Sequence, residues 1–251
     1  RLGIMGGTFD PIHYGHLVAA EEALVQFNLD RVIFMPTGQS ARKVDRQVTS
    51  AEHRYLMTVI ATASNPDFEV SRLEVDRPGV TYTVDTMAEL RKTHGEESDL
   101  YFITGADAVL EILTWKDSAR FAGLCTFIAA TRPGYDLSKL AAQAGVEHLS
   151  VETMEVPALA ISSTDIRERV ASRRPVRYLL PEAVVSYIKK YGLYLGGSRR
   201  GVQLRAGSRC AGTAAVHRLI RPCRACCRDG GLARRHLRRR CGRRAPSRAA
   251  P

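Results

Sequence analysis

Short apolar runs alternate with longer segments of helical periodicity along residues 1–194. Runs rich in apolar and β-branched residues predict strands at Leu2–Met5, Val32–Met35, Phe68–Ser71, Leu100–Thr104, Thr126–Ala130 and Leu149–Glu155. Apolar positions three and four residues apart predict helices at Leu17–Phe27, Ala51–Ala63, Val84–Thr93, Ala106–Leu113, Ile166–Ser172 and Glu182–Tyr191. Because the two patterns alternate, we expect an α/β fold with a mostly parallel sheet and helices on both faces.

A change in composition separates residues 195–251 from the rest of the chain. This segment holds 16 of the 37 Lys and Arg residues, one of the 26 acidic residues and five of the six cysteines. The net charge of +11 therefore originates there, and residues 1–194 carry a net charge of −4. The segment shows no sustained apolar periodicity, so we expect a globular domain over 1–194 and a disordered tail over 195–251. We interpret the tail as dispensable, with a nucleic-acid-binding arm as the alternative.

The chain shows neither a signal-peptide layout nor an apolar run of about 18 residues, the length that a membrane span needs. We therefore expect a cytoplasmic protein without a membrane partner. Within residues 1–194 the only cysteine is Cys125, which argues against a disulfide-stabilised fold. Thr49-Ser50-Ala51-Glu52 predicts a capping box at the start of the second helix.

A glycine-rich segment joins the first predicted strand to the first predicted helix: Gly6-Gly7-Thr8-Phe9-Asp10-Pro11-Ile12-His13-Tyr14-Gly15-His16. Glycines allow a close approach of the backbone to a ligand, and a helix start offers unpaired N–H donors to an anion. His13 and His16 add further donors at the same place. The segment therefore predicts a phosphate site, although the histidines can also cap or pack the helix. Asp10 either fixes the turn or contacts the ligand.

A second segment with the same chemistry lies near the end of the domain: Ile161-Ser162-Ser163-Thr164-Asp165-Ile166-Arg167. Ser162, Ser163 and Thr164 are residue types that favour helix N-caps, and in isolation such a run is usually only a cap. Their hydroxyls and the N–H groups of the helix start form a second candidate anion site. Arg167, one turn further on, can add a bidentate phosphate contact.

Together the two segments resemble the signatures of the nucleotidylyltransferase superfamily, most closely those of bacterial nicotinate-nucleotide adenylyltransferases. The resemblance extends over residues 1–194. It implies a Rossmann-like nucleotidylyltransferase fold and transfer of the adenylyl group of ATP to nicotinate mononucleotide, with nicotinate adenine dinucleotide and pyrophosphate as products. Adenylyl transfer to another acceptor, nicotinamide mononucleotide or phosphopantetheine, is the alternative.

The resemblance also implies roles for individual residues. His13, His16 and Arg167 would be catalytic, at the phosphates. The ATP site would be formed by Gly6, Gly7, Thr8, Phe9, His13, His16, Lys43, Gly105, Asp107, Ser162, Ser163, Thr164 and Arg167. The nicotinate mononucleotide site would be formed by Thr83, Thr86, Trp115 and Arg132.

Simpler roles stay open for some of these residues. Asp107 suits the start of a helix as an acidic residue, Thr83 suits an N-cap, and Trp115 suits the core. Lys43 lies in the loop Thr37–Lys43, where many family members carry Pro-Pro-His-Lys; here it can equally belong to a solvated basic loop.

No His, Cys or Asp cluster with zinc-ligand spacing occurs in residues 1–194, so we expect no metal site built from protein side chains. The resemblance implies Mg²⁺, held mainly by the phosphates of ATP. ATP and nicotinate mononucleotide are the expected partners, and homo-oligomerisation is left open.

Overall fold

The structure, a computed structural model, describes residues 1–40, 48–106, 108, 115, 117–131 and 150–195. The tail predicted over 195–251 lies outside the described residues, apart from Leu195. Of the predicted helix Ala106–Leu113, only residues 106 and 108 are described. Both predictions therefore stay predictions.

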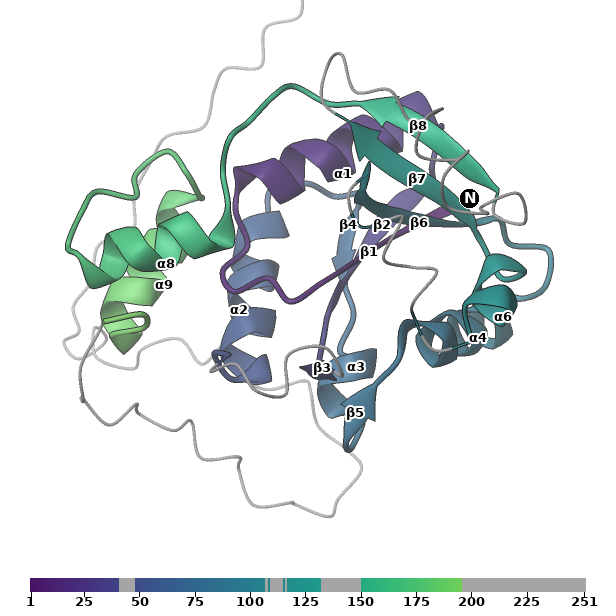
Figure 1. The fold of residues 1–251 in the computed structure, drawn as a ribbon, viewed down its shortest axis with the longest axis horizontal. Helices are drawn as coiled ribbons and strands as arrows, with labels where there is room; N and C mark the ends of the chain where they lie inside the picture. The colour runs from purple at the N-terminus through teal and green to yellow at the C-terminus, as the bar shows by residue number, and fades with distance from the viewer. Residues whose placement is uncertain (41–47, 107, 109–114, 116, 132–149, 196–251) are drawn as a thin grey trace, which may run out of the picture. The chain divides into compact units, whose positions relative to one another are not determined.

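A six-stranded parallel sheet forms the centre of the fold, with the strand order β4-β2-β1-β6-β7-β8 (Figure 1). Each of its strands coincides with a predicted one, and every neighbouring pair is parallel. The bounds are β1 Leu2–Gly7, β2 Arg31–Pro36, β4 Phe68–Val70, β6 Leu100–Gly105, β7 Thr126–Thr131 and β8 Val151–Glu155. The prediction of a mostly parallel α/β fold is confirmed.

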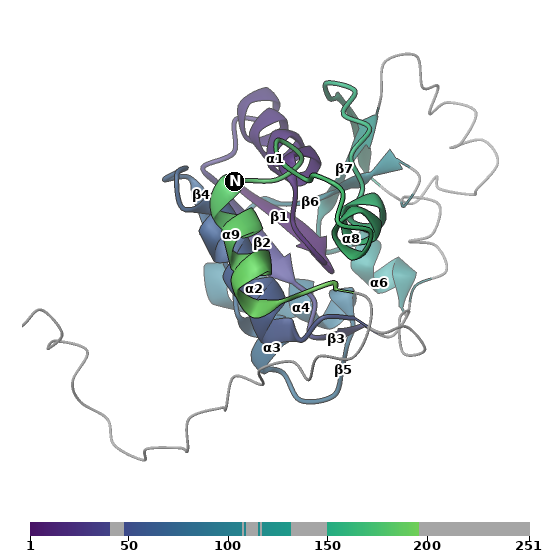
Figure 2. The same cartoon turned by 90° about the vertical axis from the view of Figure 1, so that its left-hand side faces the viewer.

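Helices cover both faces of this sheet (Figures 1 and 2). One face packs against α1 (Tyr14–Gln26), α2 (Ala51–Thr62), α8 (Ser163–Ala171) and α9 (Glu182–Tyr191). The other face packs against α4 (Thr83–His94) and α6 (Ser118–Ala122). Among the described helices, none has the length and apolar character needed to cross a membrane.

Successive residues of the central strands enter opposite cores, which explains why these strands are continuous apolar runs. Ile4 packs on the α4 side and Met5 on the α1 side, and Phe102 and Ile103 of β6 divide in the same way. Gly3 also matters here, because a Cβ atom on it would lie 2.8 Å from Leu29 Cδ1. A strand buried on both faces has few polar positions, as parallel sheets require.

Some elements differ from the predictions. Helix α1 begins at Tyr14 rather than Leu17, so the end of the glycine-rich segment is itself helical. The short helices α3 (Leu73–Asp76) and α6 were not predicted. Strands β3 (Gln39–Ser40) and β5 (Val80–Thr81), also not predicted, pair in parallel as a separate two-stranded sheet.

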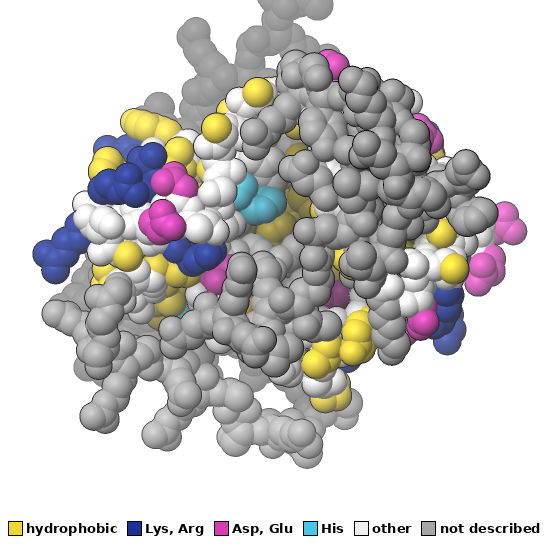
Figure 3. All heavy atoms as spheres, in the orientation of Figure 1, with side chains coloured by type: hydrophobic (Ala, Val, Ile, Leu, Met, Phe, Trp, Pro, Cys, Tyr) yellow, Lys and Arg dark blue, Asp and Glu magenta, His cyan; other side chains and the backbone are white. Residues whose placement is uncertain are grey.

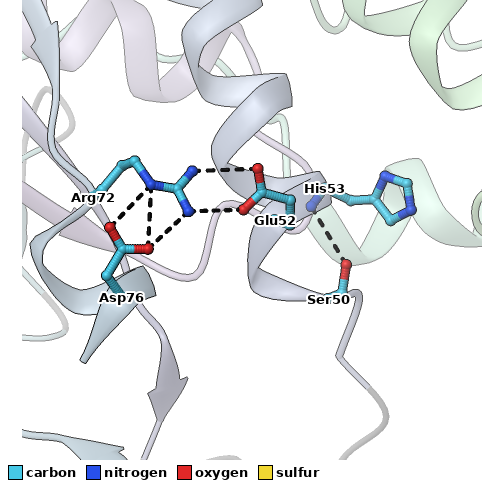
Figure 4. A network of polar contacts seen from close by, with 5 residues as sticks. All are labelled: Ser50, Glu52, His53, Arg72 and Asp76. Atoms are coloured by element: carbon cyan, nitrogen blue, oxygen red, sulfur yellow. Dashed lines mark hydrogen bonds and ion pairs between the residues drawn. The ribbon is translucent and has the colours of Figure 1, made fainter. Parts of the chain in front are cut away.

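The start of α2 differs in detail from the predicted capping box (Figure 4). Ser50 is the N-cap, and its Oγ accepts a hydrogen bond from the His53 N–H at 3.4 Å. Glu52 instead receives a bidentate contact from Arg72, with Nη1–Oε1 at 3.2 Å and Nη2–Oε2 at 3.0 Å. Arg72 also donates to Asp76, so this network joins α2 to the short helix α3.

Candidate active site

The carboxyl ends of β1 and β6 meet at the point where the chain reverses its direction across the sheet. From β1 the chain proceeds to β2 and β4 on one side, and it returns to β6 on the other. Met5 pairs with Ile103, so the two strands end level at Gly7 and Gly105. A Cβ atom on Gly105 would meet no atom of the described residues within 4 Å, so these residues leave open space at this edge. In parallel α/β sheets, ligands bind at such a switch point.

Two glycines of the first motif, Gly7 at the end of β1 and Gly15 in α1, make room for aromatic rings of the same motif. A Cβ atom on Gly7 would lie 2.8 Å from the Phe9 ring, and one on Gly15 would lie 3.1 Å from the His13 ring. Phe9 is buried and contacts the His16 ring edge-on, with 5.1 Å between centroids. The glycines therefore serve the packing of the motif in addition to any ligand approach.

The two motif histidines stack on each other at the start of α1, with ring centroids 3.7 Å apart. The backbone N–H of His13 donates to His16 Nδ1 at 3.2 Å. Since that nitrogen is an acceptor, the proton of the neutral His16 ring is on Nε2. Among the described residues His13 Nδ1 has no hydrogen-bond partner, although it is buried. In Figure 3 histidine surface is visible near the start of α1.

Burial keeps both rings neutral in the absence of a ligand. It lowers the pKa of His13 from 6.5 to about 4. The pKa of His16 is lowered well below 6.5, first by burial and then by repulsion from His13. At neutral pH each ring is therefore an uncharged donor, and a phosphate anion placed beside it would favour the protonated form.

The second motif begins helix α8 and touches the first motif directly. Ser163 Oγ donates to the Pro11 carbonyl at 2.8 Å, and Arg167 Nη1 donates to the Asp10 carbonyl at 2.7 Å. Arg167 Nη2 also donates to Thr164 Oγ1 at 3.2 Å. The structure thus brings together two segments that lie about 150 positions apart in the sequence.

Ser162 is used as a cap. Its Oγ accepts a hydrogen bond from the Asp165 N–H at 3.1 Å and so satisfies one donor of the α8 start. Ser162 and Thr164 are exposed, whereas Arg167 is partly buried. The starts of α1 and α8 are therefore joined through the loop that connects β1 to α1.

Asp10 acts as a turn residue in this structure. Its Oδ1 accepts a hydrogen bond from the Tyr194 hydroxyl at 2.7 Å, and its Oδ2 accepts one from the Thr49 N–H at 3.3 Å. Because both carboxylate oxygens are engaged inside the protein, the structure favours the turn interpretation over direct ligand contact.

Three of the four predicted acceptor residues, Thr83, Thr86 and Trp115, are described, and they lie on the α4 side of the sheet. Thr83 is the first residue of α4 and is partly buried. Thr86 is 1% exposed; its hydroxyl donates to Glu74 Oε1 at 2.8 Å and accepts from Arg77 Nη1 at 2.8 Å. Its hydroxyl is therefore already engaged within the protein.

Trp115 is partly buried and stacks on Phe121, with an interplanar angle of 6°. It also meets the Phe102 ring edge-on. These contacts are those expected from the simpler role of Trp115, packing in the core, which was the alternative to stacking on a ligand.

Three predicted site residues, Lys43, Asp107 and Arg132, lie outside the described residues. Within the part of the chain that is described, no three His, Cys, Asp or Glu side chains gather into a group that could hold a metal ion. Two residues that contact the first motif, Arg54 and Tyr194, were not predicted. In the sequence, Arg54 could have been recognised as unusual because it occupies a position on the face of α2 that Met57 and Ala61 bury.

Comparison with known proteins agrees with this arrangement. The cytidylyltransferase-like family model matches residues 4–169. A probable nicotinate-nucleotide adenylyltransferase of Moorella thermoacetica is 61% identical over 198 residues, which is 77% of this chain and 91% of the relative. One of Thermoanaerobacter sp. is 57% identical over 206 residues, which is 80% of this chain and 98% of the relative.

A solved structure has the same fold at much lower sequence identity. It is the Plasmodium falciparum nicotinic acid mononucleotide adenylyltransferase complexed with NaAD, with a TM-score of 0.65 and 20% identity. The match covers 77% of this chain and 96% of that chain. From the family model and the relatives together, this chain belongs to the cytidylyltransferase-like family and, within it, to the nicotinate-nucleotide adenylyltransferases.

Proposed function

We propose that this chain transfers the adenylyl group of ATP to nicotinate mononucleotide, giving nicotinate adenine dinucleotide and pyrophosphate, a step of NAD biosynthesis. The junction of the two motifs carries the proposal, because it places two helix starts, two histidines and an arginine beside one strand edge. The names of relatives at 57% and 61% identity support the choice of acceptor.

The reaction needs positioning and charge stabilisation rather than an enzyme nucleophile. The phosphate of nicotinate mononucleotide would attack the α-phosphorus of ATP, and the bond to the pyrophosphate leaving group would break. We assign His13, His16 and Arg167 to the charge that grows on the phosphate oxygens in this step. His16 suits the role because its Nε2 carries a proton while its Nδ1 is fixed by the backbone.

The remaining roles follow from the position of each residue. Ser163 and Thr164, with Ser162 as the cap of α8, would hold the departing pyrophosphate at the helix start. Gly6, Gly7, Thr8 and Phe9 would border the nucleotide, Gly105 and Asp107 would bind its ribose, and Lys43 would approach the triphosphate. Thr83, Thr86, Trp115 and Arg132 are assigned to the nicotinate end.

The contacts that Thr86 and Trp115 already make inside the protein limit how each can act at the nicotinate end. Thr86 would act through the Glu74 and Arg77 contacts that hold the start of α4, because its own hydroxyl faces inward. Trp115 would act from its place against Phe121 and Phe102, at the edge of the α4-side core.

The described residues do not fit a protein-held Mg²⁺ site. Asp10, the carboxylate of the first motif, accepts hydrogen bonds from Tyr194 and Thr49 with its two oxygens. The neighbouring imidazoles and the Arg167 guanidinium are not groups that Mg²⁺ prefers. We therefore assign no step to a metal held by this chain and propose that Mg²⁺ enters with ATP, as part of the substrate. A cytoplasmic location, the tail and the oligomeric state stay predictions.

The acceptor is tested by steady-state pyrophosphate release with ATP and Mg²⁺ on the full chain. We expect kcat/KM to be highest with nicotinate mononucleotide, lower with nicotinamide mononucleotide and negligible with phosphopantetheine. Release that is highest with either of the other two acceptors would contradict the proposed substrate and leave the adenylyl-transfer chemistry in place.

A further inference from the structure

The loop between β1 and α1 is held by side chains that belong to neither motif. It ends at His13, the N-cap of α1, and His16 lies in the first turn of that helix, so the position of the loop sets where both histidines point. Beyond the contacts from α8, two side chains reach it from distant parts of the chain: Arg54 from α2 and Tyr194 from the segment after α9. The two residues contact different positions of the four-residue stretch Thr8–Pro11: Arg54 contacts Thr8, and Tyr194 contacts Asp10.

Arg54 joins three segments through backbone carbonyls. Its Nη1 donates to the Thr8 carbonyl at 2.7 Å, its Nη2 to the Gly38 carbonyl at 3.0 Å and its Nε to the Thr49 carbonyl at 2.8 Å. The side chain is 2% exposed, and burial lowers the pKa of its guanidinium, which stays charged because an arginine pKa is so high. A buried cation whose hydrogen bonds end on three carbonyls fixes the distances between those segments.

Those three segments border the edge of the sheet where the site lies. Thr8 follows β1, Gly38 follows β2, and Thr49 precedes α2. A lysine at position 54 would keep the charge but not the planar fork, so it cannot satisfy the three carbonyls with the same geometry. Loss of the fork would therefore remove the shared donor of the Thr8 and Gly38 carbonyls without removing a positive charge, while Thr37 still donates to the Gly7 carbonyl.

Tyr194 holds the same stretch two residues further on, through Asp10. Its hydroxyl donates to Asp10 Oδ1 at 2.7 Å, while Thr49 donates to Oδ2. Burial and the Asp10 charge raise the pKa of the Tyr194 hydroxyl, so it stays protonated and remains the donor. Thr49 is a partner of both Asp10 and Arg54, which links the two anchors.

We propose that Arg54 and Tyr194 are positioning residues for adenylyl transfer: they hold Thr8–Pro11, and through it His13 and His16, in the geometry that the reaction needs. The inference rests on the proposed function. It goes beyond the two motifs, because neither residue belongs to them and neither is required to touch substrate.

The test is a set of conservative variants with matched controls. Arg54→Lys is compared with Arg91→Lys, because Arg91 also donates to three backbone carbonyls, those of Glu96, Ser98 and Leu124, but at the opposite end of the sheet. Tyr194→Phe is compared with Tyr187→Phe, which removes a hydroxyl that contacts His53 Nδ1 at 2.9 Å. Each full-length variant is checked for folding by circular dichroism, and kcat and KM are measured with ATP and nicotinate mononucleotide.

We expect Arg54→Lys to lower kcat by about tenfold or more, since a misplacement of about 1 Å can cost roughly 100-fold in rate. KM for ATP should change less than kcat, because the displaced donors matter most in the transition state. Tyr194→Phe should lower kcat by about threefold or more, and both controls should stay within about twofold of the parent.

Two results would overturn the inference: a folded Arg54→Lys protein with the kcat of the parent, or an equal loss in Arg91→Lys. If Arg54→Lys does not fold, the test rests on Tyr194→Phe. A kcat of Tyr194→Phe equal to that of Tyr187→Phe would then contradict the proposal. If the parent itself releases no pyrophosphate with nicotinate mononucleotide, the proposed function fails separately. Amide hydrogen exchange of the loop after β1 then tests the anchoring, and equal protection of that loop in Arg54→Lys and Arg91→Lys would refute it.

Discussion

Mild acid should destabilise this protein through the histidine pair at the start of α1, of which His13 is buried. Burial lowers the pKa of His13 from 6.5 to about 4, so between these values the unfolded chain binds a proton that the folded chain resists. The stability due to the neutral ring is therefore fully present above the unfolded pKa and is lost as the pH falls toward the folded one. His16 shifts in the same direction, for the same reason and through repulsion from His13.

The size of the effect follows from the two pKa values of His13. Between pH 7 and pH 5 they imply a loss of about 2 kcal/mol in the free energy of unfolding from this residue. His13→Asn removes the titration and keeps a residue type that is favoured at N-caps. The difference in unfolding free energy between parent and variant should therefore shift by about 2 kcal/mol in favour of the variant on going from pH 7 to pH 5.

Urea unfolding followed by circular dichroism at the two pH values measures this shift. Carboxylates and the histidines distant from His13 titrate equally in parent and variant, so the comparison cancels them. His16 loses the repulsion from His13 in the variant, which acts in the same direction as the expected shift. His94→Asn is the control, because His94 is exposed at the end of α4 and is solvated in both states. A parent–variant difference that is the same at pH 7 and pH 5 would refute the assignment of His13 as a buried neutral ring.

Three substitutions test other parts of the account. His16→Ala should lower kcat/KM for adenylyl transfer by about 100-fold or more while the circular dichroism spectrum is preserved; unchanged turnover would contradict its role. Gly38→Ala would place a Cβ atom 2.1 Å from the Glu74 carbonyl oxygen. The resulting strain should lower stability by about 1–3 kcal/mol, seen as a lower Tm, and an unaltered Tm would exclude this contact. Ser162→Ala removes the α8 cap and should cost about 1 kcal/mol in urea unfolding.

The periodic elements were predictable because the physical cause is local. Strands such as β1 and β6 are apolar on both faces, since each face enters its own core, and that leaves a continuous apolar run in the sequence. In helix α2 the buried residues Arg54, Met57 and Ala61 follow one another at spacings of three and four, as one face of a helix requires. The glycine-rich segment was recognisable because its residue types suit only a few backbone arrangements.

The remaining features depend on contacts that local pattern does not encode. Strands β3 and β5 have two residues each and exist only because they pair with each other. The start of α1 was predicted too late, because Gly15 and His16 carry no apolar signal. Arg54 and Tyr194 lie 46 and 184 positions from their partners Thr8 and Asp10, so their role at the loop becomes visible only in three dimensions.

The central claim, that the joined motifs catalyse adenylyl transfer to nicotinate mononucleotide, is tested most directly by product analysis. The full chain is incubated with ATP, Mg²⁺ and nicotinate mononucleotide, and the products are identified by chromatography with mass detection. The account predicts nicotinate adenine dinucleotide and pyrophosphate in equal amounts, with both lost together in Arg167→Ala. ATP consumption without the dinucleotide, or dinucleotide formation that is undiminished in Arg167→Ala, would contradict it.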